Sequence, residues 1–290
     1  SIKNILKADH PSILKSIDFG EKGYGREYRP TLVTEFNENI SLRDVITKSE
    51  LSSQFNATKK LINIYGIACG MSYLHSHNIL HRELTPMNII EDSNFYPKIK
   101  DFDMNGNFES MKTLTKMHEI SPYLSPESYT NNEYTQKSEV YSFGMIVYAI
   151  MTNELPFDQI TNIEYMNNVE HQIRPSFEKY QEKIPTPYRE LISRCWNNDP
   201  KLRPTFSEIK DELETKPEFI TTLRVDSNEY ENYKTIIKES EAKQKSLEEE
   251  TNNTNDETEP ESQHKFSGHG GSSDDDDDDD KKPSHVPGGG

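Results

Sequence analysis

The segment HRELTPMN at residues 81–88, together with DFD at residues 101–103, decides how the rest of the sequence is interpreted. Three further stretches follow in order: SPE at 125–127, SEVYSFG at 138–144 and CWNNDPKLRPTF at 195–206. Any one of them is weak evidence, because a lone Asp or Asn in a polar loop is more often a turn or capping residue than a ligand. Their order along one chain points to a single site built from several loops.

Regular elements are predicted on both sides of the first segment. At residues 56–75 the apolar side chains recur at steps of three and four, which predicts a helix with a broad buried face. Gly66 and Gly70 in this helix would let a neighbour pack closely. Residues 89–90 and 98–100 are expected to form short strands around a turn. Further helices are predicted at 138–151, 187–196 and 204–213.

The ordered set of stretches resembles the protein-kinase catalytic domain, most closely that of tyrosine-kinase-like serine/threonine kinases. The resemblance covers roughly residues 1–215. It implies an α+β, protein-kinase-like fold with a mostly helical C-lobe and a partial β N-lobe. Residues 1–36 would be the remnant of the N-lobe, and residues 37–215 the hinge and the C-lobe.

The resemblance implies ATP and Mg²⁺ as cofactors and places the catalytic residues. Phosphoryl transfer needs metal ions on the phosphates and a carboxylate near the attacking hydroxyl. Asp101 matches the magnesium-binding Asp of the DFG motif, and Asn88 matches the catalytic-loop Asn that holds a second metal. Both offer hard oxygen ligands, which suit magnesium. Glu83 falls where kinases carry the catalytic Asp.

The nucleotide-binding residues are also implied by the resemblance. Thr34 matches the gatekeeper at the end of a predicted strand, Glu35 and Asn37 match the hinge, and Ile90 matches the floor of the adenine pocket. The alternative for each is an ordinary structural position at a strand end.

Several residues depart from the kinase pattern. Glu83 is one methylene longer than Asp, which would displace its oxygens by roughly 1 Å. Thr85 stands where a phosphate-contacting Lys is usual and brings no charge. Asp103 replaces the Gly of DFG, and Glu119-Ile120 replaces Gly-Thr. Glu139 replaces the Asp that orients the catalytic loop, so the loop is expected to be held more loosely or to have shifted.

The start of the sequence contains little of a kinase N-lobe. The αC glutamate position falls at Ser1, and the glycine-rich loop and the β3 lysine would lie before it, so these parts of the nucleotide site are absent from the sequence. Residues 20–25 are glycine-rich but are interpreted as a hairpin turn. By contrast, Glu127 and Arg203 match the buried ion pair that ties the activation segment to the C-lobe.

Composition limits the remaining possibilities. The formal net charge of −17 excludes a strongly basic nucleic-acid binder. No apolar run is long enough for a membrane span. Two cysteines cannot form a disulfide framework, which favours a cytoplasmic protein. Residues 216–250 are predicted to be a charged extension that could form a solvated helix. Residues 251–290, with seven consecutive aspartates, are predicted to be a disordered acidic tail.

The function expected from the sequence is ATP-dependent phosphoryl transfer to protein Ser or Thr, impaired in this chain. The partner would be a protein substrate or a signalling protein. The alternative is a pseudokinase that acts as a nucleotide-binding or non-catalytic scaffold in signalling. A third possibility is a partial reading frame without a stable fold.

Overall fold

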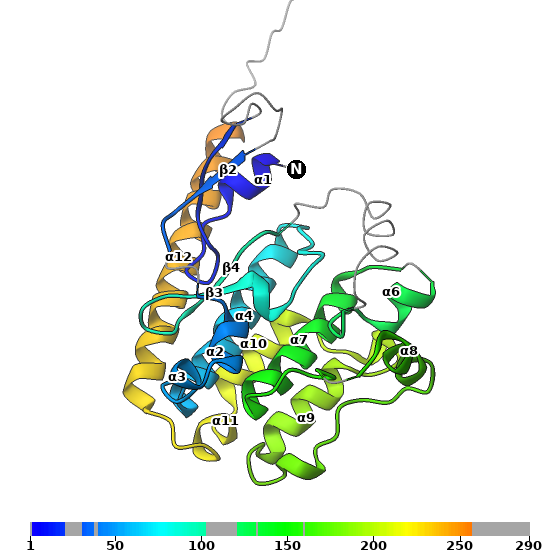
Figure 1. Ribbon diagram of the computed structural model, residues 1–290. Coiled ribbons are helices and arrows are strands. Elements are labelled where there is room, and N and C mark those ends of the chain that lie inside the picture. Colours follow the sequence, from blue (N-terminus) through cyan, green and yellow to red (C-terminus); the bar gives the residue numbers. More distant parts are fainter. Residues whose placement is uncertain are drawn as a thin grey trace, which may run out of the picture. The chain divides into compact units, whose positions relative to one another are not determined.

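The computed structural model describes residues 2–20, 31–37, 40–102, 121–131, 133–158 and 160–256. The chain divides into two compact units, Ser1–Ser246 and Leu247–Gly290. The described part of the second unit, residues 247–256, is the end of one helix. Figure 1 shows the elements, which are α1 (Ile2–Lys7), β1 (Ser16–Gly20), β2 (Thr31–Thr34), α2 (Leu42–Thr47), α3 (Ser49–Ser52), α4 (Ala57–Ser76), η1 (Pro86–Asn88), β3 (Ile89–Glu91), β4 (Pro97–Ile99), α6 (Pro126–Thr130), α7 (Gln136–Thr152), α8 (Asn162–Glu170), η2 (Glu178–Tyr180), α9 (Thr186–Cys195), η3 (Pro200–Leu202), α10 (Phe206–Thr215), α11 (Glu218–Thr221) and α12 (Ser227–Asp256).

The described strands form two small antiparallel sheets. β1 pairs with β2, with Ser16 opposite Thr34. β3 and β4 form a hairpin in which Ile89 lies opposite Ile99. Ile13, which precedes β1, forms a parallel bridge to Ile99, so the N-terminal segment is tied to the second sheet. Helices make up most of the rest, and the α+β class expected from the sequence is confirmed.

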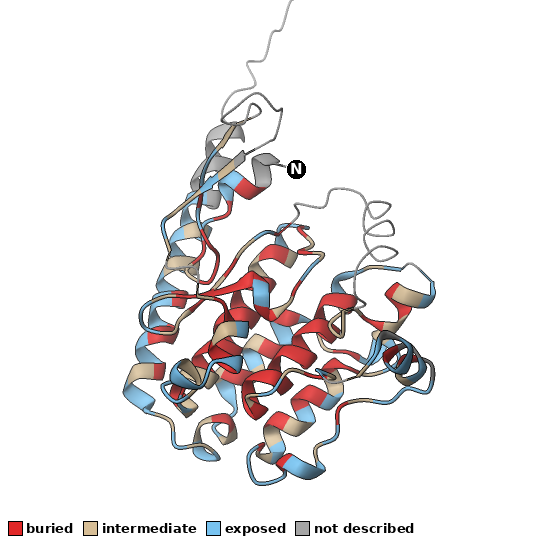
Figure 2. Ribbon diagram, in the orientation of Figure 1, coloured by how far each residue is buried: buried red, intermediate tan, exposed pale blue. Residues whose placement is uncertain are grey.

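Two long helices, α4 and α7, form the centre of the core. All residues from Leu61 to Met71 in α4, and from Ser138 to Thr152 in α7, are buried (Figure 2). A helix that is apolar on every side is stable only where other elements surround it. Asn56 caps α4 by accepting a hydrogen bond from the Lys59 amide. None of the helices in the described ranges combines the length and the apolarity that crossing a bilayer requires.

The two glycines of α4 make the close approaches that the sequence predicted. A Cβ atom at Gly70 would lie 2.7 Å from Ile99 Cδ1 and 3.1 Å from the Ser12 carbonyl oxygen. A Cβ atom at Gly66 would overlap the hydroxyl group of Tyr233 in α12. Residues without a side chain are therefore required where β4 and α12 pack against α4.

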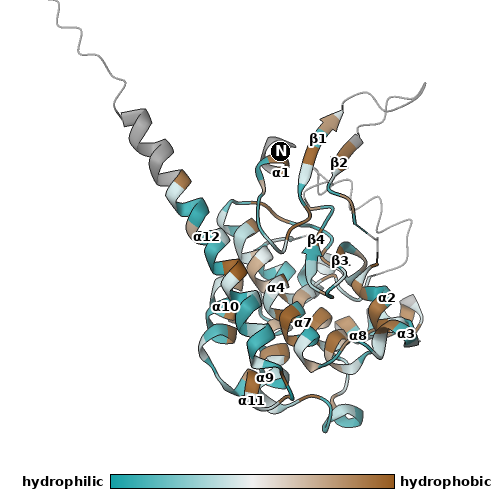
Figure 3. Ribbon diagram, turned by 90° about the vertical axis from the view of Figure 1, so that its left-hand side faces the viewer, coloured by the Kyte–Doolittle hydropathy of each residue, from teal (hydrophilic) through white to brown (hydrophobic). Residues whose placement is uncertain are grey.

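The C-terminal helix α12 is docked along one face. Tyr230, Tyr233, Lys234 and Ile237 are buried, whereas their neighbours on the other side of the helix are exposed. The spacing of three and four residues places them on one stripe. Many of the coloured residues of α12 are hydrophilic (Figure 3). The sequence predicted a solvated helix here, and only the outer face of α12 is solvated.

Glu91, the last residue of β3, is a carboxyl group with no exposed surface. Its Oε2 accepts a hydrogen bond of 3.2 Å from Asn63 Nδ2, and Oε1 has no hydrogen-bond partner among the described residues. Burial raises the pKa of Glu91 from 4.5 to about 8, and the hydrogen bond from Asn63 offsets this only in part. The neutral acid is therefore the form that the fold favours.

We expect Glu91→Gln to remove a pH dependence of stability. The native carboxyl group binds its proton more tightly than the unfolded one, so wild-type stability should fall as pH rises from 4.5 to about 8 and level off above that. Gln keeps an oxygen for Asn63 and does not titrate. The stability difference should therefore grow in favour of the variant by roughly 1.4 kcal/mol per pH unit in this window. Denaturant unfolding of both proteins at about pH 5, 7 and 9 measures it, and a constant difference would contradict the assignment.

Candidate active site

The loop at residues 81–88 is fixed by the first turn of α7. The fully buried Glu139 accepts a hydrogen bond of 2.7 Å from the Arg82 backbone amide. Arg82 has a φ of 74°, a left-handed conformation that is unfavourable for a residue with a long side chain. A hydrogen bond to a buried carboxylate is strong enough to hold such a conformation.

Two further groups orient the Glu139 carboxylate. His75 Nε2, in the last turn of α4, lies 2.6 Å from Glu139 Oε2, and the Tyr134 hydroxyl donates a hydrogen bond of 3.0 Å to Oε1. Burial, together with the nearby Glu139, raises the pKa of Tyr134 well above its usual value, so this hydroxyl keeps its proton. The sequence predicted a looser or shifted loop at this Asp-to-Glu exchange. The longer Glu139 nevertheless reaches the loop backbone and is held from two other segments.

Glu83 and Asn88 are joined through the backbone of the same loop. Asn88 Nδ2 donates a hydrogen bond of 2.9 Å to the Glu83 carbonyl oxygen. The Glu83 amide donates to His81 Nδ1 at 3.3 Å, and burial lowers the pKa of His81, which keeps this ring neutral and able to accept. The Glu83 backbone is thus held on both sides, while its side chain is exposed. The Asn88 amide oxygen is the atom that this arrangement leaves for a ligand.

Asp101 follows the end of the β3–β4 hairpin. The Lys100 amide donates a hydrogen bond of 3.0 Å to the Asn88 carbonyl oxygen, which continues the strand pairing by one step. Asn88 and Asp101 therefore lie at the same end of the hairpin. Asp101 has a φ of 58°, and its Oδ2 lies 3.1 Å from Lys100 Nζ, with 48% of the Asp101 side chain exposed. An ion pair this exposed is weak and can be displaced by another cation.

A cleft of about 730 Å³ adjoins this loop. Its lining combines residues of the loop with three distant segments, and consists of Arg43, Glu83, Thr85–Asn88, Ser121–Tyr123, Leu155–Asp158, Ile160 and Thr161. Glu83 and Asn88 thus share a cleft with an apolar wall around Phe157. That wall was not predictable from the sequence, because residues 155–158 have neither periodicity nor a motif.

Three of the four residues expected to bind the nucleotide lie at the end of the second strand of the first sheet. Thr34 ends β2, and Glu35 and Asn37 follow it. Glu35 Oε1 accepts hydrogen bonds from Lys98 Nζ at 2.7 Å and from the Lys15 amide at 3.1 Å. Burial alone would raise the pKa of Glu35, but these bonds outweigh it and hold the pKa below its usual value. Since Lys98 belongs to β4, Glu35 is tied to the hairpin that carries Asn88 and Asp101.

Ile90, the fourth of these residues, lies in β3 with 2% of its surface exposed. It forms an antiparallel bridge to Ser41, the capping residue of α2. This bridge places the start of α2 beside the hairpin.

Comparison with known proteins settles the family. The family model described as protein tyrosine and serine/threonine kinase matches residues 1–213. The chain belongs to the protein kinase family. The kinase domain is 33% identical over 232 residues to the dual specificity protein kinase pyk3 of Dictyostelium discoideum, covering 77% of this chain and 16% of that protein. It is 30% identical over 212 residues to serine/threonine-protein kinase 12 of Arabidopsis thaliana, covering 71% of this chain and 44% of that protein.

The kinase domain therefore spans less than half the length of these two relatives. Kinases of this family use ATP and Mg²⁺ and act on proteins. Within the described residues no group of three or more His, Cys, Asp or Glu side chains could hold a metal ion.

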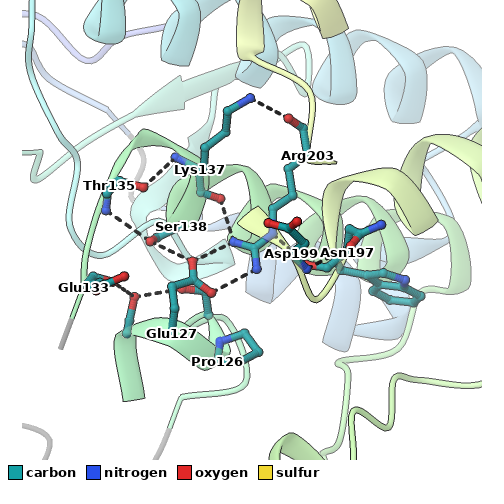
Figure 4. Close-up of polar contacts among 12 residues, drawn as sticks. Pro126, Glu127, Glu133, Thr135, Lys137, Ser138, Asn197, Asp199 and Arg203 are labelled. Carbon is teal, nitrogen blue, oxygen red and sulfur yellow. Dashed lines mark hydrogen bonds and ion pairs between the residues drawn. The ribbon is translucent and has the colours of Figure 1, made fainter. Parts of the chain in front are cut away.

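Glu127 and Arg203 of the kinase domain form the buried ion pair expected from the sequence. Arg203 Nη1 donates to Glu127 Oε1 at 2.7 Å and Nη2 donates to Oε2 at 2.9 Å (Figure 4). Ser138 in the first turn of α7 donates a further hydrogen bond of 3.0 Å to Glu127 Oε1. The pair joins α6 to the segment after η3 and to α7.

Some of the residues singled out in the sequence lie outside the described residues. These are Ser1, residues 21–25 of the glycine-rich stretch, Asp103 and Glu119-Ile120. Their expected contributions to the kinase site stay predictions.

Proposed function

We propose that this kinase domain transfers the γ-phosphoryl group of ATP to Ser or Thr hydroxyl groups of a protein substrate, and that it does so slowly. The observation that carries the proposal is the hydrogen bond between the Lys100 amide and the Asn88 carbonyl oxygen. Through it the hairpin brings Asn88 and Asp101 to one end, and Asn88 lines the same cleft as Glu83.

Asp101 and Asn88 are the residues proposed to hold magnesium. A carboxylate and an amide oxygen are hard ligands, and Mg²⁺ completes its coordination with water and phosphate oxygens. Mg-ATP, when bound, supplies the phosphoryl group and neutralises the charge on its oxygens. Thr34, Glu35, Asn37 and Ile90 are proposed to line the nucleotide site. The tie between Glu35 and Lys98 supports their placement beside the same hairpin.

Glu83 is proposed to accept the proton of the attacking hydroxyl group. Its exposed side chain lines the cleft of about 730 Å³, which is large enough for a segment of a protein substrate. Thr85 in the same cleft can donate a hydrogen bond to a phosphate oxygen but adds no positive charge.

Three features support a low rate. The Glu83 carboxylate lies one methylene further from its backbone than that of Asp, Thr85 is uncharged, and Lys100 competes with a metal ion for Asp101. The same features favour a second candidate function. In that case the domain binds nucleotide without transfer and serves as an interaction module in signalling.

Two measurements on the purified chain separate these functions. We expect saturating Mg-ATP to stabilise the domain by a few kcal/mol, as expected for a ligand in large excess over its Kd, and to label a generic protein acceptor slowly. Asp101→Asn should remove the part of the stabilisation that requires Mg²⁺, whereas Asp211→Asn, an exposed substitution in α10, should not. Stabilisation without labelling would favour the second candidate. If Mg-ATP caused neither stabilisation nor labelling, both nucleotide-dependent functions would be contradicted.

A further inference from the structure

Helix α12 follows the residues that match the kinase family model, which end at 213. Its first half nevertheless packs against the kinase domain, next to α4 and α10 (Figure 3). Tyr230 contacts Tyr65 of α4 edge to face, with ring centroids 5.8 Å apart, and its hydroxyl donates to the Leu213 carbonyl oxygen at 3.3 Å. Lys210 of α10 forms an ion pair with Glu241 of α12. These contacts attach the helix to the helical part of the domain.

The same face of α12 also reaches the N-terminal segment. Tyr233, which is 2% exposed, shares a hydrogen bond of 3.0 Å with Ser12 Oγ. Glu241 Oε1 lies 3.7 Å from Nε2 of the buried His10. Burial lowers the pKa of His10 despite the nearby Glu241, so this contact is not a full ion pair at neutral pH. Gly66 provides the space that the Tyr233 hydroxyl occupies.

Ser12 also contacts the end of β4 through its backbone. Its carbonyl oxygen accepts a hydrogen bond of 2.8 Å from the Ile99 amide, and the Leu14 amide donates to the Ile99 carbonyl oxygen at 2.9 Å. Asp101 follows Ile99 by two residues. A continuous line of hydrogen bonds and covalent bonds thus runs from Tyr233 through Ser12 and Ile99 to Asp101.

We propose that α12 is a positioning strap, which holds Ser12 against β4 and thereby positions the backbone that leads to Asp101. The proposal rests on the proposed function only in assigning Asp101 to magnesium. Tyr233 and Ser12 are positioning residues in this arrangement, since neither belongs to the cleft or to the nucleotide site. The C-terminal extension then controls how tightly the domain binds a nucleotide with its metal.

The conservative variant Tyr233→Phe tests this strap in the full chain. It keeps the ring packed against Tyr96, whose centroid lies 4.8 Å away, and removes only the hydroxyl group that bonds to Ser12. Tyr230→Phe is a matched control, because it removes a buried hydroxyl hydrogen bond from the same face of the same helix, but one to Leu213. The probes are hydrogen exchange of amides 98–102 and the Kd values for ADP with and without Mg²⁺.

We expect Tyr233→Phe to speed exchange at residues 98–102 and to weaken Mg-ADP binding by roughly three- to tenfold, the loss of one hydrogen bond. Binding of metal-free ADP should be unchanged, and Tyr230→Phe should change neither quantity. A purely structural role for α12 predicts the same effect from both variants, which would overturn the proposal. Unchanged exchange at residues 98–102 in Tyr233→Phe would also overturn it.

The hydrogen-exchange measurement and the nucleotide-binding measurement test different claims. If the wild type binds no ADP, the proposed function fails. In that case the difference in exchange between the two Tyr-to-Phe variants still decides whether α12 controls the position of residues 98–102.

Discussion

Arg203→Ala is expected to lower the free energy of unfolding of the kinase domain by about 3–5 kcal/mol, the usual cost of removing one partner from a buried ion pair. The Arg203 side chain is 0% exposed, and Glu127 is 10% exposed. The Arg203 guanidinium also donates to the Asn197 and Lys137 carbonyl oxygens, at 2.8 and 3.0 Å. Its removal leaves the Glu127 carboxylate buried without its cationic partner, although the hydrogen bond from Ser138 remains.

The pH dependence of this variant gives an independent check. Burial alone would raise the pKa of Glu127, but hydrogen bonding and attraction from Arg203 hold it below 4.5 in the wild type. The pair therefore contributes its full stability above pH 4.5 and loses it as pH falls through the native pKa. Without Arg203, burial would raise the pKa of Glu127 instead. The stability difference between wild type and Arg203→Ala should then shrink on acidification.

Arg194→Ala provides the control for charge removal in general. Arg194 Nη2 also donates to both oxygens of a carboxylate, that of Glu212, but the Arg194 side chain is 42% exposed and Glu212 pairs with Lys216 as well. We expect this variant to cost no more than about 1 kcal/mol. Denaturant unfolding at neutral pH compares the two variants. If both variants lost the same free energy of unfolding, burial would not be the reason why the Glu127–Arg203 pair stabilises the domain.

Parts of the fold that depend on local pattern were predictable from sequence. The steps of three and four at residues 56–75 correctly indicated α4, and the glycines in it marked its close neighbours. The β3–β4 hairpin followed from two short β-rich runs around a polar turn. The Glu127–Arg203 pair joins residues 76 positions apart, and only the resemblance to kinases could place them together.

Contacts between distant segments were not predictable. Tyr230, Tyr233 and Ile237 are too few among charged residues to give α12 a strong apolar signal, and the space for Tyr233 is made by Gly66, far away in the sequence. Two of the partners of Glu139, His75 and the Arg82 amide, lie far away in the sequence, so the change from Asp to Glu suggested a loop that is held more loosely or has shifted. Whether a longer carboxylate fits depends on what surrounds it, which one sequence does not show.

Glu83→Asp is expected to raise the turnover number of phosphoryl transfer by a factor on the order of 10², the usual effect of correcting a misplacement of about 1 Å. Two hydrogen bonds hold the backbone of Glu83: its amide donates to His81 Nδ1, and its carbonyl oxygen accepts from Asn88 Nδ2. Shortening the side chain should therefore move the carboxylate and leave the loop in place. The change should raise kcat with little effect on the KM for ATP, since Glu83 is not assigned to the nucleotide site.

Two further variants make this expectation decisive. Glu190→Asp shortens an exposed carboxylate in α9 by the same methylene, and should leave the rate unchanged. Glu83→Gln keeps the length of the side chain and removes its basicity, so it should abolish the transfer that the wild type supports. If Glu83→Gln were as active as the wild type, the carboxylate would not be accepting the proton. If Glu83→Asp were slower than the wild type while Glu83→Gln was inactive, Glu83 would already be correctly placed, and the low rate would have to come from Thr85 or from the Lys100–Asp101 pair.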